Sequence, residues 1–413
     1  MNIWIISVGE PLPTDGKNTR LRRMGNLAKY LTEEGHVVNW FSVSFDHYKK
    51  CQRCNKNKSI IINDNYTMHL IFTPGYKKNI SFARIFHHKI AGRNISKKME
   101  QIPKPDIILA SMEPLEVSAV AAKFGAKYKI PVVIDVRDLW PEIYFEVVPR
   151  CLHIFLKIYV NICRYTLKKT MRNAYSIIGL SKNFLEYGLQ YSGRNQGELD
   201  EVFPIAYPNY DYSQWSDKFD EYWSEAGIKK NDFLVVFLGN FGKQFTFKFI
   251  IDAANELTNI SEIKFILCGT GQQMDDIKLY APKNVFFTGW IEEKQILSLA
   301  ANAKIGLAPY IDSKNYIQNT PNKFGEYLSA SLPIAVSVKG IMEELLNQYK
   351  CGFRYNNGIE LAAIIKHYYD DRNLWKEHSY NARCLYEEQF NADNSNKQLS
   401  NYLQKVTDHY ERV

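Results

Sequence analysis

The chain has 413 residues, of which 46% are hydrophobic and 23% are charged, and its formal net charge is +8. This length predicts two or three domains, and the ordinary composition excludes a disordered, collagenous or low-complexity protein. No apolar run approaches the roughly 20 residues that span a bilayer, and residues 1–10 lack the basic start of a signal peptide. With seven irregularly spaced cysteines, these features predict a cytoplasmic protein without a disulfide framework.

The first forty residues predict a strand, a loop, a helix and a second strand. Apolar, β-rich residues occupy Asn2–Val8 and Val37–Val43, the loop Pro11–Lys17 contains Gly16, and Leu21–Leu31 has apolar residues at helical spacing. Such a βαβ unit is the building block of a parallel sheet. The same alternation continues with a helix at 116–127 and with strands at 106–110, 130–136 and 175–180.

A second alternation begins after the proline-marked segment Pro204–Asn209. It predicts helices at 247–257 and 321–331 and strands at 233–238, 264–268, 285–288, 304–309 and 333–338. Glycine directly follows three of these strands, at Gly239, Gly269 and Gly289. The expected fold class is α/β, with two doubly wound, Rossmann-like domains that face each other across a cleft. Ligands of such sheets bind beyond the carboxyl ends of the strands, so these loops are candidate sites.

The segment 319–338 carries the most informative motif. Thr320 can cap a helix whose first residue is Pro321, and the free N–H groups of such a helix start can bind a phosphate. Lys323 near that start opposes the helix dipole unless an anion is bound there, and Glu326, one turn further, can accept hydrogen bonds from a ribose diol. The alternative is an ordinary capped helix with an ion pair between these two residues.

This segment resembles a motif of the glycosyltransferases with the GT-B fold, specifically the family 4 type. The matching residues are Lys323–Leu328 and Leu332–Ile334, in which Glu326 takes the place of the glutamate that holds the nucleotide ribose. The first glutamate of the family's pair is replaced by Gln318. The resemblance implies a GT-B fold, transfer with retention of anomeric configuration, and a nucleotide-sugar donor bound by the C-terminal domain.

Further segments resemble a bacterial subgroup of this family that builds O-antigen and capsule repeat units. They are Val136–Glu142, Gly75–Ser81 with Arg84 and His88, Phe237–Gln244, and Phe287–Trp290. Their order along the chain makes the resemblance specific and extends it over nearly the whole sequence. It implies an acceptor-side domain over 1–205, a donor domain over 206–390, and a last helix over 391–413 that returns to the N-terminal domain.

The candidate site residues lie just after the expected strands or at the start of the 321–331 helix. For the donor they are Gly16, Gly239, Gly242, Lys243, Gly271, Gly289, Gln318, Thr320, Pro321, Asn322, Lys323 and Glu326. For the acceptor they are Asn18, Arg20, Arg137, Asp138 and Glu142. The candidate catalytic residues are Asp138, Lys323 and Glu326. Glycine loops that carry a lysine can bind a diphosphate. The alternative role of these loops is that of plain strand–helix turns. The alternative role of Asp138 is that of a helix cap.

Two stretches of the chain are basic and contain no acid. Gly75–Met99 has seven basic residues and Cys151–Arg172 has five, interleaved with aromatic residues. On a helix, one face of the second stretch holds Lys157, Arg164, Lys168 and Arg172. The opposite face, which we expect to meet the sheet, holds Phe155, Tyr159, Ile162 and Thr166. The basic face predicts charge-based binding to the inner face of the bacterial inner membrane, and the alternative is a solvated helix face.

The function expected from these features is a retaining hexosyl or N-acetylhexosaminyl transferase. It would move a sugar from a nucleotide sugar, with UDP favoured, to a lipid-diphosphate-linked saccharide in surface polysaccharide biosynthesis. We expect no cofactor and no metal, because the donor half lacks an Asp-x-Asp pair, and no nucleic-acid partner. The alternatives are a nucleotide-sugar epimerase of the same fold and a basic nucleic-acid-binding protein. Cys51 and Cys54 have CxxC spacing, but no second pair completes a zinc set nearby.

Overall fold

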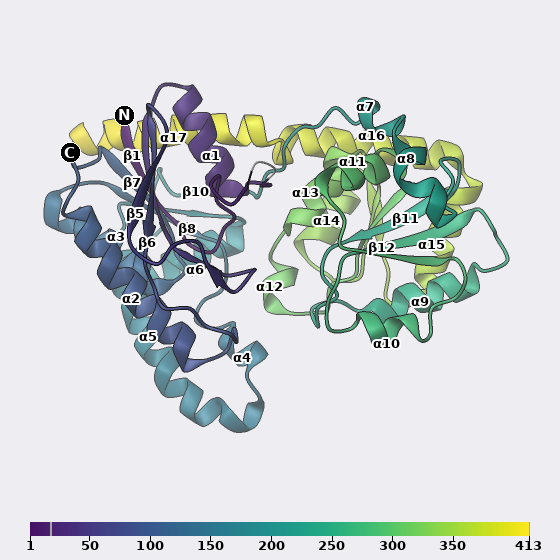
Figure 1. Cartoon of the computed structure of the whole chain (residues 1–413), viewed down its shortest axis with the longest axis horizontal. Coiled ribbons are helices and arrows are strands. Elements are labelled where there is room, and N and C mark those ends of the chain that lie inside the picture. The colour runs from purple at the N-terminus through teal and green to yellow at the C-terminus, as the bar shows by residue number, and fades with distance from the viewer. Residues whose placement is uncertain (17–18, 413) are drawn as a thin grey trace. The chain divides into compact units, whose positions relative to one another are not determined.

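A computed structural model describes residues 1–16 and 19–412 of the chain (Figure 1). The chain divides into two compact units. The N-terminal unit comprises Met1–Pro204 together with Asp393–Val413, and the C-terminal unit comprises Ile205–Ala392. Each unit is built on its own sheet, so each is described by itself.

The sheet of the N-terminal unit has eight strands in the order β10-β9-β8-β7-β1-β2-β6-β5. All neighbours are parallel except β5, which pairs antiparallel with β6 at the edge. The strands are β1 (Asn2–Ile6), β2 (Val37–Val43), β5 (Lys58–Asn63), β6 (Tyr66–Ile71), β7 (Ile107–Ser111), β8 (Val132–Val136), β9 (Ser176–Gly179) and β10 (Glu201–Val202). A separate hairpin joins β3 (Phe45–Asp46) to β4 (Cys51–Gln52).

Helices cover both faces of this sheet. They are α1 (Arg23–Glu33), α2 (Phe82–Met99), α3 (Leu115–Tyr128), α4 (Tyr144–Val147), α5 (His153–Asn173), α6 (Lys182–Ser192) and α17 (Ala392–Arg412), with a 3-10 turn at Arg150–Leu152. Side chains alternate between the two faces along β1. Ile3 and Ile5 join the core made with α1 and α17, whereas the Trp4 ring lies 5.3 Å from the Phe124 ring of α3. The last helix therefore completes the hydrophobic core of the N-terminal unit (Figure 1).

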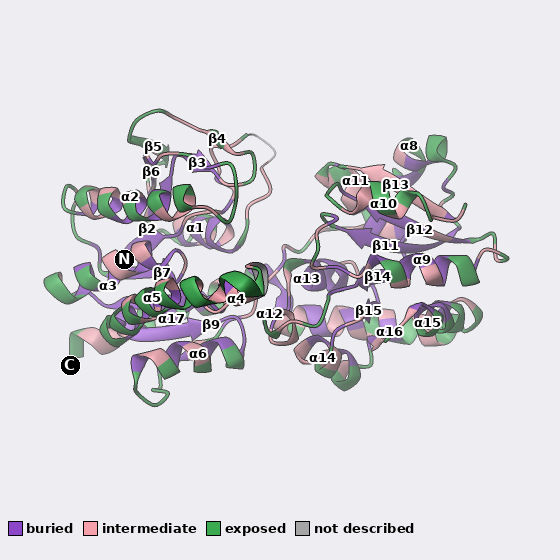
Figure 2. Ribbon diagram, turned by 90° about the horizontal axis from the view of Figure 1, so that it is seen from below, coloured by how far each residue is buried: buried purple, intermediate pink, exposed green. Residues whose placement is uncertain are grey.

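The buried face of α5 differs from the one predicted. Phe155 and Ile162, expected against the sheet, are exposed, while the helix buries Val160, Cys163 and Leu167. The buried positions recur at helical spacing and pack between α3 and α6, so neighbouring helices rather than the sheet select the buried stripe. The first turns of α5 consequently present large apolar side chains to solvent. Figure 2 shows α5 as exposed over much of its ribbon.

The C-terminal unit has a fully parallel six-stranded sheet in the order β13-β12-β11-β14-β15-β16. Its strands are β11 (Phe233–Leu238), β12 (Ile263–Cys268), β13 (Val285–Gly289), β14 (Ile305–Ala308), β15 (Ile334–Val336) and β16 (Gly352–Arg354). Its helices are α7 (Ser213–Ser216), α8 (Phe219–Trp223), α9 (Phe247–Glu256), α10 (Met274–Lys278), α11 (Glu293–Asn302), α12 (Lys314–Ile317), α13 (Asn322–Ser329), α14 (Ile341–Tyr349), α15 (Gly358–Asp370) and α16 (Arg372–Leu385). Shorter turns occupy Ser224–Ala226 and Tyr386–Phe390.

The start of α13 lies one residue later than predicted. Pro321 is the N-cap, with an extended ψ of 159°, and Asn322 is the first helical residue. The Pro321 carbonyl accepts the first turn's hydrogen bond from the Phe324 amide (2.8 Å), so Thr320 does not cap the helix as expected. Strand β11 begins and ends as predicted, and because its residues are buried on both faces, its apolar run is continuous.

Candidate functional site

Lys323 and Glu326 lie on α13 at the carboxyl end of the C-terminal sheet. Both side chains belong to buried residues, each 7% exposed. Lys323 Nζ donates a hydrogen bond to the carbonyl oxygen of Leu238, the last residue of β11 (2.6 Å). Tyr327, on the same helix, accepts from the Leu238 amide (3.0 Å) and donates to the Leu307 carbonyl (3.1 Å). These bonds fix α13 against the ends of β11 and β14.

The Lys323 ammonium is held among aromatic rings. Its Nζ lies 4.4 Å from the ring centre of Phe237 and 4.7 Å from that of Phe245, distances at which the cation is attracted to the ring faces. Burial lowers the pKa of Lys323 to about 8, and the nearby Glu326 carboxylate acts in the opposite direction. An anion bound beside Nζ would further favour the charged form of this buried lysine.

Three glycine loops follow the strand ends next to α13, and the first of them meets this ammonium. A Cβ on Gly239 would stand 2.6 Å from Lys323 Nζ, so a larger residue at 239 would displace the lysine head. The Phe241 amide donates to the Thr270 carbonyl (2.9 Å), and the Gly269 amide donates to the Gly289 carbonyl (2.7 Å). The loops after β11, β12 and β13 are therefore tied into one backbone surface.

Glu326 has a defined partner in the same unit. Tyr207 Oη donates to Glu326 Oε1 (3.0 Å), and both residues are buried. The sequence motif did not indicate Tyr207, whose ring joins the unit's core next to the polar bond. Glu326 lies one helical turn from Lys323 on α13.

The remaining predicted donor residues are spread around this centre. Gly242 belongs to the loop tied to Gln273, whose amide donates to the Gly242 carbonyl (2.6 Å), and Lys243 next to it is exposed. Gly271 packs against that loop, because a Cβ there would meet the Phe241 backbone. Three further candidates precede or begin α13: Gln318 is half-buried, Thr320 is buried and Asn322 is exposed.

A second polar cluster lies at the carboxyl ends of the strands in the N-terminal unit. Arg137, just after β8, pairs with Glu10 (2.5 Å) and donates to Ser111 Oγ (3.2 Å). The other oxygen of Glu10 accepts from the Met24 amide at the start of α1 (3.1 Å). The predicted residue Arg137 is thus held by Ser111 at the end of β7 and by Glu10, which the start of α1 holds in turn.

Asp138 lies beside a carboxyl group that the sequence analysis missed. The Asp138 amide donates to Glu113 Oε1 (3.1 Å). Burial raises the pKa of Glu113 well above its usual value, the Asp138 carboxylate adds to this shift, and Arg137 opposes it. A carboxyl group with a raised pKa, beside a second carboxyl group and an arginine, can donate as well as accept hydrogen bonds toward a hydroxyl-bearing ligand.

The other acceptor-side candidates have different surroundings. The Glu142 carboxylate accepts from Arg164 Nε (2.9 Å), Tyr191 Oη (2.7 Å) and Tyr187 Oη, which ties its loop to α5 and α6. Gly16 is exposed, and Arg20 is half-buried. The predicted residue Asn18 lies outside the described residues.

A buried ion pair joins α1 to β8, the strand that directly precedes Arg137. Arg23 of α1 donates through Nε and Nη2 to the two oxygens of Asp135 in β8 (2.9 and 3.4 Å), and both side chains are almost fully buried. The signal for this pair was an aspartate within the apolar run 132–136. A charge inside a buried strand needs a partner, and 112 residues separate the two members of the pair.

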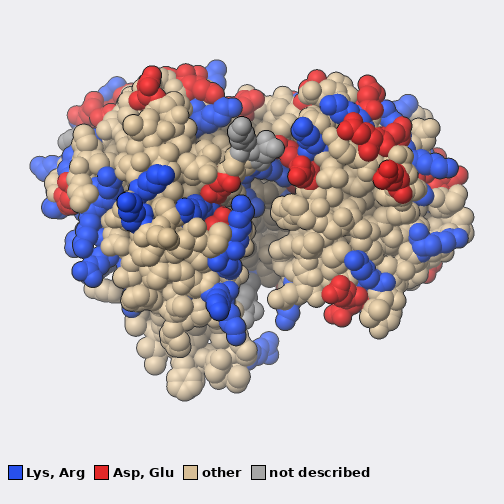
Figure 3. Space-filling model, viewed as in Figure 1, with Lys and Arg blue, Asp and Glu red and all other residues tan. Residues whose placement is uncertain are grey.

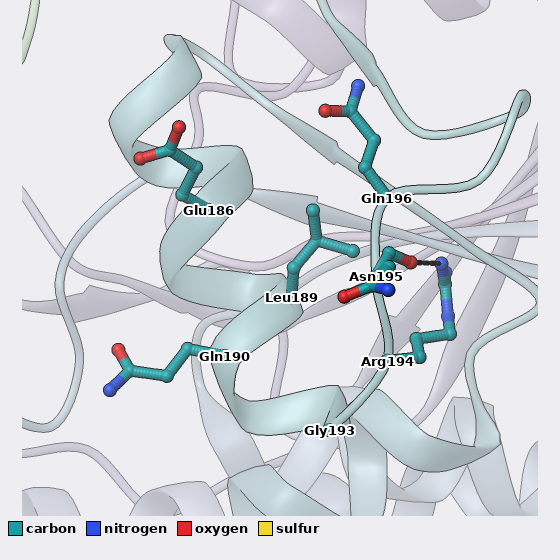
Figure 4. A pocket seen from close by; sticks show the side chains of 7 residues that line it. All are labelled: Glu186, Leu189, Gln190, Gly193, Arg194, Asn195 and Gln196. Carbon is teal, nitrogen blue, oxygen red and sulfur yellow. Dashed lines mark hydrogen bonds between the residues drawn. The ribbon is translucent and has the colours of Figure 1, made fainter.

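A hollow elsewhere in the N-terminal unit is unrelated to these clusters. It lies between the end of α6 and the following loop and is lined by Leu189, Gln190, Arg194 and their neighbours (Figure 4). Arg194 pairs with Asp200, so its charge is already matched. Within the described part of the chain, no three His, Cys, Asp or Glu side chains gather as a metal site would need. Across the same residues, no helix is long and apolar enough to cross a membrane.

Comparison with known proteins finds a family match and similar folds. Residues 232–371, which include α13 and the glycine loops, match the family described as "Glycosyl transferases group 1". Solved structures match over nearly their whole length and that of this chain. The HepE protein of Anabaena in complex with UDP has 15% sequence identity and a TM-score of 0.68, over 98% of this chain and 100% of its own. The chain has the GT-B fold.

Two further GT-B structures show the same likeness. Sucrose-phosphate synthase from Thermosynechococcus elongatus has 14% identity and a TM-score of 0.72, over 99% of both chains. WaaG, a glycosyltransferase involved in lipopolysaccharide biosynthesis, has 13% identity and a TM-score of 0.65, over 97% of this chain and 99% of its own. No curated protein matches the sequence. The family match and the GT-B fold together support a glycosyltransferase.

Proposed function

We propose that this GT-B protein is a retaining glycosyltransferase that moves a sugar from a nucleotide sugar to a lipid-linked saccharide. The observation that carries the proposal is the pair Lys323 and Glu326, buried beneath the glycine loops in the segment that matches the glycosyl transferase family. HepE structures contain UDP or UDP-glucose, which favours UDP as the nucleotide. WaaG acts in lipopolysaccharide biosynthesis, which favours a surface polysaccharide such as O-antigen or capsule as the product.

In this proposal the C-terminal unit binds the donor. Glu326 holds the ribose hydroxyls, and the tied backbone of the Gly239, Gly269 and Gly289 loops approaches the diphosphate closely. Lys323 neutralises the negative charge that grows on the leaving diphosphate, with Lys243 at the rim of the loop. The protein's charges and dipoles then perform the work that a bound divalent ion performs elsewhere, and the donor half has no Asp-x-Asp pair to hold one.

The N-terminal unit would bind the acceptor sugar. Asp138 and Glu113 lie together beside Arg137 at the strand ends, where sugar hydroxyls can exchange hydrogen bonds with both carboxyl groups. With Glu113 protonated, the pair can donate as well as accept. Arg137 is oriented by Glu10 and Ser111 and keeps Asp138 in a fixed electrostatic setting.

The donor assignment predicts selective stabilisation by one nucleotide sugar. In a thermal-unfolding panel of UDP-, GDP- and dTDP-sugars, the true donor at about 100 times its Kd should stabilise the protein by about 2.7 kcal/mol. Glu326→Gln should weaken binding of the matching nucleoside diphosphate at least about tenfold, because a charged hydrogen bond is lost. The exposed Glu344 provides a matched control, and Glu344→Gln should leave the affinity unchanged. Equal affinity for the Glu326 variant and the wild type would contradict the ribose role.

We also propose that the protein works as a peripheral protein on the inner face of the bacterial inner membrane. The first turns of α5 expose Ile154, Phe155, Ile158 and Ile162 to solvent, with Phe155 72% exposed. Lys157 lies among them, and Cys151–Arg172 contains no acid. The lower tip of the N-terminal unit, where α5 begins, is free of acidic surface in the view of Figure 3. Apolar contact and attraction to anionic lipids would therefore act together.

Vesicle binding tests this surface. The wild type should co-sediment with vesicles containing phosphatidylglycerol and should retain part of that binding at high salt, because apolar side chains enter the interface. Phe155→Ser with Ile158→Ser should reduce binding about tenfold or more. Ile359 in the C-terminal unit is equally exposed at 71%, so Ile359→Ser is the control that should bind normally. Loss of all wild-type binding at high salt would show that the protein binds vesicles by charge alone, as the sequence predicts.

A further inference from the structure

A group of basic and hydroxyl-bearing side chains lies at the carboxyl edge of the N-terminal sheet, apart from Arg137 and Asp138. His47 and Lys50 come from the turn between β3 and β4, Tyr76 and Asn79 from the loop after β6, and Arg84 from the first turn of α2. We call these five residues the α2 cluster. None of them belongs to the candidate site described above.

The members of the α2 cluster are in direct contact. Tyr76 Oη lies 2.6 Å from His47 Nδ1, and Lys50 Nζ donates to Asn79 Oδ1 (2.5 Å) and lies 4.6 Å from the centre of the Tyr76 ring. Arg84 Nη1 donates to the Asn79 carbonyl (3.0 Å). The ammonium and the guanidinium therefore share the same asparagine and the same ring, although they come from different segments.

The positive charge of the cluster is not matched by nearby acids. Asp46 is the adjacent carboxylate, but it accepts from the Tyr48 and Lys49 amides (2.8 and 2.9 Å) and from Arg53 (3.2 Å). Glu116 lies 4.0 Å from His88, behind the cluster. Among the described residues, Lys50 and Arg84 bond only to neutral groups, and Arg84 Nε is buried without an acceptor.

The same excess of positive charge helps to lower the pKa values of the histidines around the cluster. Burial is the main cause that lowers the pKa of His47 to about 4, and the charges of Lys50 and Arg84 contribute to this shift. The pKa values of His87 and His88, on the next turn of α2, are lowered by burial and by Arg84 as well. Two cations held close together among neutral histidines favour a bound anion, which would accept charge-assisted hydrogen bonds from both.

Large apolar side chains border the cluster on its solvent side. Ile80 follows Asn79 directly, Phe82 is the first residue of α2, and Phe86 lies one turn further along that helix. All three are exposed, and Phe82 is 90% exposed. Lys77 and Lys78 in the same loop are exposed too. A phosphate-binding group beside solvent-facing phenylalanines fits a ligand whose anionic head is attached to a hydrocarbon chain.

We propose that the α2 cluster binds the diphosphate of the lipid-linked acceptor, with Lys50 and Arg84 on the phosphate oxygens and Ile80, Phe82 and Phe86 against the first lipid segment. This inference rests on the proposed function, since it names the part of the acceptor that the N-terminal unit holds. The cluster would act in binding and positioning, and the sugar at the other end of the diphosphate would undergo the reaction.

Titration calorimetry with two probes tests the proposal. Inorganic pyrophosphate and farnesyl diphosphate, the latter below its micelle concentration, are titrated into the full chain while saturating UDP occupies the donor side. Lys50→Met and Arg84→Met should each weaken both probes roughly tenfold or more, because each removes a charged donor. Lys49 is exposed and adjacent, so Lys49→Met is the matched control and should leave both affinities unchanged. Phe82→Ala should weaken farnesyl diphosphate alone.

The outcomes separate the possible sources of the anion. If Phe82→Ala changes nothing and both probes bind alike, the cluster is a site for free phosphates and the lipid part of the proposal is overturned. If Lys49→Met weakens binding as much as Lys50→Met, attraction is general and the whole proposal is overturned. Failure of every nucleoside diphosphate to bind would contradict the glycosyltransferase function instead, while the comparison of Lys50→Met with Lys49→Met would still decide the cluster.

Discussion

Replacing Lys323 with methionine should lower kcat for sugar transfer roughly 100- to 1,000-fold, the usual cost of losing one preorganised group that stabilises developing charge. The ammonium lies beneath Gly239 and bonds to the end of β11, so it is already placed when the donor binds. Methionine keeps the length and the apolar packing against Phe237 and Phe245. The loss should appear mainly in kcat, measured with the donor identified by the thermal panel.

The same lysine should make donor binding depend on pH. Burial depresses its pKa to about 8, so the free protein loses the charge as pH rises through this value. A bound diphosphate favours the charged form, and affinity should therefore fall above pH 8 by up to about tenfold per pH unit. Calorimetry between pH 7 and 8.5 should show this slope in the wild type and none in Lys323→Met.

Lys243 supplies the matched control for both measurements. It carries the same charge in the neighbouring loop but is exposed, so Lys243→Met should cost much less in kcat and should leave the pH slope in place. If the Lys243 variant lost as much activity as the Lys323 variant, the buried ammonium would have no special role in neutralising the diphosphate.

Replacing Asp135 with asparagine should destabilise the N-terminal unit by about 3–5 kcal/mol, because it leaves the Arg23 guanidinium buried without its counter-charge. For a unit of this size, the melting temperature should fall by roughly 6–20 °C. Differential scanning calorimetry measures the change, and the transition of the C-terminal unit should stay where it is.

Two variants decide whether the buried charge is the cause. The double replacement Arg23→Met with Asp135→Leu should recover most of the lost stability, since it removes both charges and keeps the volume. The pair Lys29–Glu33 on the same helix is exposed at both members, so Glu33→Gln should cost less than about 1 kcal/mol. A double variant as unstable as Asp135→Asn would point to lost packing instead.

Much of the fold could be read from the order of short apolar runs. Val37–Val43 and Phe233–Leu238 are strands with the predicted bounds. The second is a continuous apolar run because a central parallel strand is buried on both faces. The hairpin of β5 and β6 escaped prediction. The edge strand β5 is largely exposed, so its sequence lacks the continuous apolar signal of a buried strand.

Local sequence likewise predicts some residues of the candidate site and misses others. Local sequence selects Lys323, Glu326 and the glycine loops, because a helix start and a strand end each have a signature over a few residues. It does not select Tyr207 or Glu113, which meet Glu326 and Asp138 from distant parts of the chain. Nor does it show that Lys323 is buried, which is what lowers its pKa.

The sequence by itself determined the α/β class, the repeated strand–helix order and the position of the α13 motif, because these depend on periodicity and on turn residues that are close in the chain. Only the tertiary structure decided which face of α5 is buried, since α3 and α6 cover Val160 and Leu167 and leave Phe155 exposed. It alone paired Arg23 with Asp135, because no local pattern records which strand end a helix will reach.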